Sequence, residues 1–117
     1  MPHYLSQVSY TPEAWARLVA HPQDRIEAVR APIEKLGGRI HNAFFAFGEF
    51  DVVVITEMPD NVSAAAIAIA FAAGGSVKSE RTTPLMTSAE ALEAIKKAGT
   101  TGYRSLTAGA SAAAARP

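Results

Sequence analysis

An apolar stretch at residues 44–59 contains two β-prone segments that flank the polar pair Gly48 and Glu49. Aromatic and β-branched residues dominate both segments, a pattern that predicts a β-hairpin with strands at residues 39–47 and 50–58. In the second strand, residues 52–55 are apolar at four successive positions. Because side chains on a strand alternate between the two faces of a sheet, we expect both faces of this strand to be covered.

Two further strands and four helices follow from the remaining pattern. We expect strands at residues 3–10 and 76–86, with Pro84 near the end of the latter or at a sheet edge. Capping residues and apolar positions at helical spacing predict helices at residues 12–20, 22–36, 62–73 and 88–98. The helix at 62–73 is apolar nearly all round, which predicts burial on more than one side.

The order of these elements predicts an α+β, ferredoxin-like βαββαβ fold with an extra C-terminal helix. Such a fold has a four-stranded antiparallel sheet with its helices on one face, and it leaves the other face bare. We expect both parities of the hairpin to be apolar, with Phe45, Phe47, Val53 and Ile55 on one face and Phe44, Val52 and Val54 on the other. A monomer would expose too large an apolar patch, so we predict a homodimer or higher oligomer built through the sheet face.

The length of 117 residues fits one domain, expected at residues 1–99. From residue 100 the composition shifts to Gly, Ser, Thr and Ala, which predicts a low-complexity tail at 100–117. Residues 103–109 are also compatible with a docking peptide within this tail.

The composition excludes several classes of function. Lys plus Arg and Asp plus Glu both number 11, so the neutral chain lacks the charge expected for nucleic-acid or anionic-membrane binding. Cysteine is absent, which excludes disulfides and thiolate chemistry. The apolar run at 64–73 is about half a membrane span, and residues 1–5 have no signal-peptide pattern. We therefore expect a cytoplasmic protein without a nucleic-acid or membrane partner.

Asp51 and His41 are the candidate catalytic residues. A carboxylate inside an apolar hairpin is costly unless it is paired. Asp51 is therefore expected either to accept backbone N–H groups or pair with Arg39 or Arg81, or to bind a ligand or act as a general base. His41 would share a cavity with Asp51 if the two side chains point the same way.

The predicted ligand-binding residues are Tyr4, Tyr10, Trp15, Asp51 and Arg81. The three aromatic residues either line a pocket between sheet and helix or belong to the core. Arg81 either contacts a ligand or pairs across an exposed sheet edge. The three histidines lack any local ligand spacing, so we expect neither a metal nor a cofactor.

Several short segments of the chain match a known family. They are the motif Gly48-Glu49-Phe50-Asp51, the strand end Ser9-Tyr10-Thr11, and residues 22–28, 36–38, 52–60 and 98–104. Together they span residues 4–104, and the chain resembles the GYD-domain family of small bacterial and archaeal proteins, with Phe50 in place of the motif's tyrosine. The resemblance implies a ferredoxin-like fold of the dimeric α/β-barrel type and no established activity. It also leaves Phe50 without the hydroxyl that a tyrosine would supply.

Two functions remain open from the sequence. The first is an oligomeric small-molecule-binding or regulatory module that holds a small metabolite. The second is an enzyme similar to the cofactor-independent monooxygenases or isomerases of this fold, with an aromatic substrate beside a histidine and a carboxylate. The fold hosts many chemistries and does not choose between them, while the sparse polar residues favour the first.

Overall fold

The computed structural model describes residues 1–106, which fall into two compact units, residues 1–85 and the part from Met86 onward. Residues 107–117, with most of the predicted tail and the end of the docking segment at 103–109, lie outside the described residues. The elements are β1 (His3–Tyr10), α1 (Pro12–Ala20), α2 (Arg25–Lys35), β2 (Arg39–Phe45), β3 (Val52–Glu57), α3 (Asn61–Ala73), β4 (Val77–Leu85) and α4 (Ser88–Ala98).

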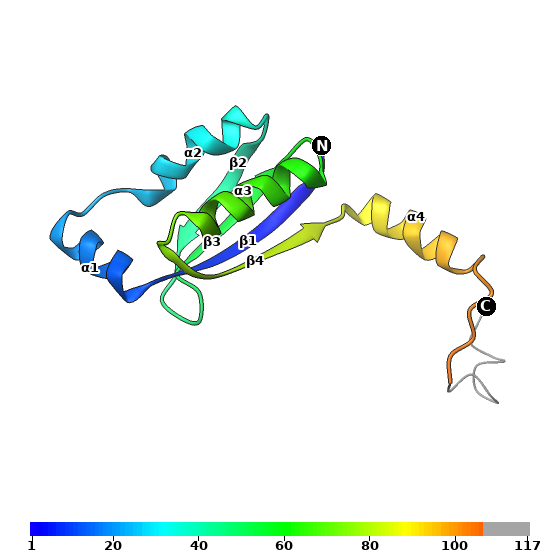
Figure 1. Cartoon of the computed structure of the whole chain (residues 1–117). Helices are drawn as coiled ribbons and strands as arrows, with labels where there is room; N and C mark the ends of the chain where they lie inside the picture. The colour runs from blue at the N-terminus through cyan, green and yellow to red at the C-terminus, as the bar shows by residue number, and fades with distance from the viewer. Residues whose placement is uncertain (107–117) are drawn as a thin grey trace. The chain divides into compact units, whose positions relative to one another are not determined.

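The four strands form one antiparallel sheet in the order β2-β3-β1-β4, with α2 and α3 on the same side of it (Figure 1). This arrangement confirms the predicted α+β, ferredoxin-like fold with a further C-terminal helix. Pro84 lies one residue before the end of β4, which is an edge strand, as predicted. In the described part of the chain, no helix combines the length and the apolar character needed to cross a membrane.

Capping side chains begin every helix. Asp24 Oδ1 accepts hydrogen bonds from the backbone of Ile26 and Glu27, so α2 begins at Arg25 and not at Pro22 as predicted. Gly37 then ends this helix with a positive φ of 88°, the left-handed conformation expected there. The N-caps of the other helices are Thr11, Asp60 and Thr87.

The hairpin groups its side chains on the two faces differently from the prediction. Phe44 pairs with Val53, and Phe45 pairs with Val52. The grouping of Phe45 with Val53 on one face was therefore wrong. The physical reason is that pairing about Gly48 and Glu49 joins even-numbered to odd-numbered positions, so residues of the same number parity lie on opposite faces. Strand β2 ends at Phe45, and Ala46 N donates to Asp51 O at 2.8 Å within the connection.

The core lies between the helices and one face of the sheet. One cluster of buried apolar side chains joins α2, α3 and the sheet, and it consists of Tyr4, Ile33, Met58, Ala64 and Ile67. The second cluster fills the centre of the sheet and consists of Val8, Val52 and Val54. Helix α3 buries Ala64 and Ile67, whereas Val62 and Ile69 are exposed. The prediction that α3 is buried on more than one side is therefore wrong for this chain.

The opposite face of the sheet, called here the open face, carries the alternate side chains of every strand. Its apolar members, placed by the register, are Leu5, Phe44, Val53, Ile55 and Leu85. Phe44 is 64% exposed, and the other four are only partly buried. Both faces of β3 are thus apolar, as the sequence predicted, but only the face toward α2 and α3 is packed within the chain.

Candidate ligand-binding cavity

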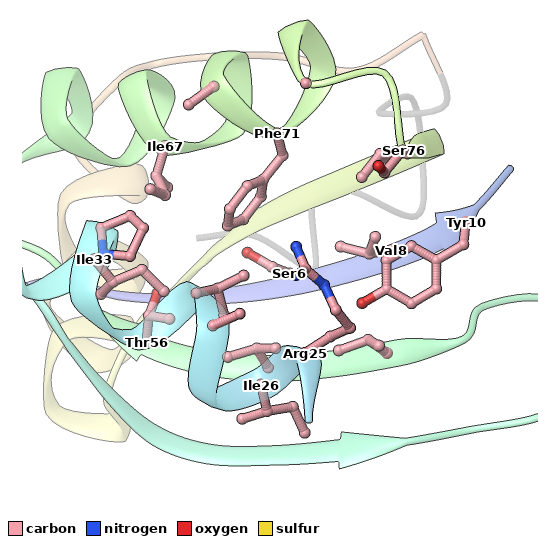
Figure 2. A pocket seen from close by; sticks show the side chains of 18 residues that line it. Ser6, Val8, Tyr10, Arg25, Ile26, Ile33, Thr56, Ile67, Phe71 and Ser76 are labelled. Carbon is pink, nitrogen blue, oxygen red and sulfur yellow. The ribbon is translucent and has the colours of Figure 1, made fainter. Parts of the chain in front are cut away.

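A cavity of about 330 Å³ lies between the sheet and helices α2 and α3 (Figure 2). Strands β1 and β3 form its floor through Ser6, Val8, Val52, Val54 and Thr56, and the two helices contribute mainly apolar side chains such as Ile26, Val29, Ile67 and Phe71. A largely apolar cavity of this size with a few polar groups is typical of small-molecule sites.

Two buried hydroxyl groups face this cavity without a protein partner. Ser6 is 8% exposed and Thr56 is 5% exposed. Within residues 1–106, neither side chain makes a hydrogen bond to another residue. Buried polar groups normally find a partner, so these two hydroxyls offer hydrogen bonds to a molecule in the cavity.

Arg25 and Tyr10 supply the remaining polar character of the cavity. Burial raises the pKa of the Tyr10 hydroxyl, and the charge and hydrogen bond of Arg25 oppose that rise. The Arg25 side chain extends from α2 over the floor strands (Figure 2), and its Nη1 donates to Gln23 Oε1 at 3.0 Å. The cavity therefore combines an apolar wall with one cationic group beside a phenol.

Asp51 lies outside this cavity, where the hairpin meets α1. Its Oδ2 accepts hydrogen bonds from Tyr10 N at 2.9 Å and from Trp15 Nε1 at 3.3 Å. The Tyr10 and Trp15 rings meet edge to face with centroids 5.5 Å apart. The contacts of Asp51 thus join β1, α1 and the hairpin. Arg81, also a predicted site residue, lies over the Phe50 ring at 5.5 Å.

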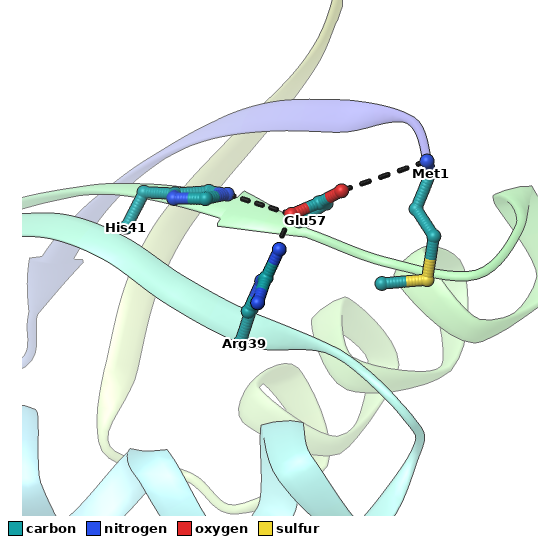
Figure 3. Close-up of polar contacts among 4 residues, drawn as sticks. All are labelled: Met1, Arg39, His41 and Glu57. Atoms are coloured by element: carbon teal, nitrogen blue, oxygen red, sulfur yellow. Dashed lines mark hydrogen bonds and ion pairs between the residues drawn. The ribbon is translucent and has the colours of Figure 1, made fainter.

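His41 lies at the other end of the hairpin, beside Glu57 (Figure 3). His41 Nε2 donates to Glu57 Oε1 at 2.8 Å, and Arg39 Nε donates to the same oxygen at 3.0 Å. The Met1 amine lies 3.5 Å from Glu57 Oε2. Asp51 and His41 are therefore not brought together, and Arg39 pairs with Glu57.

One group of side chains has the composition of a metal site. The donor atoms of His3, His41 and Glu57 lie within 4.8 Å of one another, and the two imidazole rings are stacked at 5.1 Å. Both Glu57 oxygens already face cationic or N–H groups, including Arg39. A metal ion would have to displace these partners, so the group acts as an ion-pair network in this structure.

This network makes the folding stability depend on pH in the acidic range. The hydrogen bonds from His41, then from Arg39, lower the pKa of Glu57 from 4.5 to about 2. A carboxyl group whose pKa is lowered by folding stabilises the protein above its unfolded pKa, and that stability is lost as the pH falls from 4.5 toward 2. We expect Glu57→Gln to remove this part of the acid dependence, as measured by urea unfolding between neutral pH and about pH 3.

Glu49→Gln is the matched control, because Glu49 is exposed in the hairpin connection and its side chain makes no hydrogen bond or ion pair with the described residues. The free energy of unfolding of this variant should fall with decreasing pH as much as that of the unmodified protein. Equal acid dependence of the unmodified protein and Glu57→Gln would contradict the assignment.

Of the five predicted ligand-binding residues, the structure brings only Tyr10 to the cavity. Tyr4 belongs to the core, where its hydroxyl donates to Asn61 Oδ1. The sequence analysis missed Ser6, Arg25 and Thr56. Serine and threonine are common in strands, and Arg25 stands in a polar stretch, so no local pattern marks these three residues.

The one-sided antiparallel sheet and the cavity beneath its helices define a ferredoxin-like α+β protein with an internal small-molecule-sized space. The GYD domain family model matches residues 4–95, and the chain belongs to that family. No curated protein was found to match the chain. The family expectation from the sequence is thus confirmed.

Proposed function

We propose that this GYD-domain protein is a homodimeric small-molecule-binding module, with one binding cavity in each subunit. The observation that carries the proposal is the cavity of about 330 Å³ between the sheet and helices α2 and α3. Its apolar walls supply affinity through burial, and its few polar groups supply orientation.

The lining favours binding over acid–base catalysis. Among the described residues that line the cavity there is no histidine, aspartate or glutamate. Asp51 and His41, which an enzyme of the alternative kind would use, make their contacts elsewhere. The groups usually needed to move a proton at neutral pH are thus absent from this lining.

The open face supports the homodimer. Its apolar side chains include two cross-strand pairs, because Phe44 lies beside Val53 and Leu5 lies beside Ile55 in the register. Patches of this kind on soluble proteins mark interaction sites. A second copy satisfies the surface best, since two equivalent apolar faces are complementary under two-fold symmetry.

Blocking the cavity tests the binding function. Ala70 lines the cavity from α3, so Ala70→Phe would place a ring in the space a ligand needs. The probe is naphthalene-2-carboxamide, a neutral fluorescent molecule, and its binding is measured by equilibrium dialysis. We expect one bound probe per subunit in the unmodified protein. The affinity should be at least about tenfold weaker in the variant, because the phenylalanine ring occupies space that the naphthalene ring of the probe needs.

Ala72→Phe is the matched control, because Ala72 is exposed on the same helix and does not line the cavity. It should bind the probe as the unmodified protein does. If the unmodified protein fails to bind, or Ala70→Phe binds equally well, the cavity is not a ligand site.

A further inference from the structure

Arg25 is the one charged side chain among the described residues that line the cavity. It is the first residue of α2, is half-buried, and reaches over the floor on which Ser6 and Tyr10 lie (Figure 2). A guanidinium group has five N–H donors. One hydrogen bond to Gln23 and one with Tyr10 leave several of these donors for another partner.

The Arg25 charge has no carboxylate partner in the described chain. Within residues 1–106, no Asp or Glu forms an ion pair with it. The nearby Asp24 carboxylate instead caps α2 through Ile26 N and Glu27 N. Removing a cation from water without a counter-charge costs free energy, so an anion in the cavity would stabilise this arrangement.

The other polar groups of the cavity fit an anion of small size. The hydroxyl groups of Ser6 and Thr56 are more than nine-tenths buried, face the cavity and have no partner in the described chain. Hydroxyls donate to carboxylate oxygens, and the planar guanidinium fork matches the two oxygens of one carboxylate. The remaining walls are aliphatic or aromatic and suit an apolar body.

We propose that the ligand of this cavity is a small organic monocarboxylate with an apolar body, whose carboxylate binds Arg25 beside the hydroxyl of Ser6. This inference rests on the proposed binding function and specifies its ligand class. The single positive charge favours one negative charge over two, because a second would remain uncompensated in an apolar space.

Two probes of the same shape test the ligand class. Naphthalene-2-carboxylate and naphthalene-2-carboxamide differ in charge and keep the same ring system. We expect the unmodified protein to bind the carboxylate about tenfold to a hundredfold more tightly, as a charge-assisted hydrogen bond implies. Arg25→Gln should bind both probes with similar affinity. Arg25→Lys, which keeps the charge but not the fork, should retain part of the preference.

Arg30→Gln is the control, because Arg30 lies on the same helix, pairs with Glu27 at 3.0 Å and does not line the cavity. It should keep the full preference for the carboxylate. Equal binding of both probes by the unmodified protein, or an unchanged preference in Arg25→Gln, would overturn the ligand class while the cavity remains a site. Failure of both probes to bind would instead overturn the proposed function itself. If Arg25→Gln does not fold, Arg25→Lys tests the ligand class instead, and an undiminished preference for the carboxylate in that variant would overturn it.

Discussion

Replacing Ile55 by glutamate is expected to convert the proposed homodimer into monomers. Ile55 lies at the centre of the open face, paired with Leu5 on one side and Asn42 on the other. In a dimer joined through this face the new carboxylate would be buried without a partner, which costs several kcal/mol. We expect the dissociation constant to rise at least about a hundredfold.

Sedimentation velocity over a range of protein concentrations measures this change. Val19→Glu is the matched control, because Val19 is an exposed apolar residue on α1, away from the sheet, and its replacement should leave the dimer intact. Far-ultraviolet circular dichroism should report an unchanged fold for both variants. A monomeric unmodified protein, or a dimer that persists in Ile55→Glu, would contradict assembly through the open face.

Met58→Ala is expected to cause the largest loss of stability. Met58 is 1% exposed and packs in the cluster with Tyr4, Ile33, Ala64 and Ile67. Its sulfur also lies where a Cβ on Gly38 would stand, so the side chain fills the space between strand and helix end. Removing a buried methionine side chain leaves a cavity and costs about 2–5 kcal/mol.

Chemical denaturation followed by the fluorescence of Trp15, the one tryptophan of the chain, measures this loss. Met86→Ala applies the same change to an exposed methionine and should alter the free energy of unfolding by less than about 0.5 kcal/mol. Similar losses in both variants would mean that the Met58 cluster is not a tightly packed core.

Local chemistry made much of the fold predictable. Thr11, Asp60 and Thr87 each supply a side-chain oxygen to a helix N-terminus, and these helices begin within one residue of the predicted positions. Both sets of alternate positions in β3 are apolar, which indicated that both faces of this strand have to be covered. These signals involve neighbours within a few residues of the chain, so no tertiary information is needed to interpret them.

The assignment of hairpin side chains to the two faces was wrong, although the sequence indicated where the turn lies. A two-residue turn at Gly48 and Glu49 pairs Phe44 with Val53, as observed, whereas the predicted grouping put Phe45 on the face of Val53. The Asp51 carboxylate accepts hydrogen bonds from Tyr10 and Trp15, partners far away in the sequence. Which residues of two paired strands share a face depends on how the turn aligns them, and number parity within each strand does not supply that alignment.

The sequence by itself determined the class of fold, the family and the presence of an apolar sheet whose two faces must both be covered. Only the tertiary structure decided where a ligand can bind. Arg25 stands in a polar stretch before α2, and Ser6 and Thr56 are common strand residues, so no local pattern marks them. They meet because the tertiary fold places β1, β3 and α2 around one cavity. Contacts between segments that are distant in sequence depend on packing, which short-range periodicity does not encode.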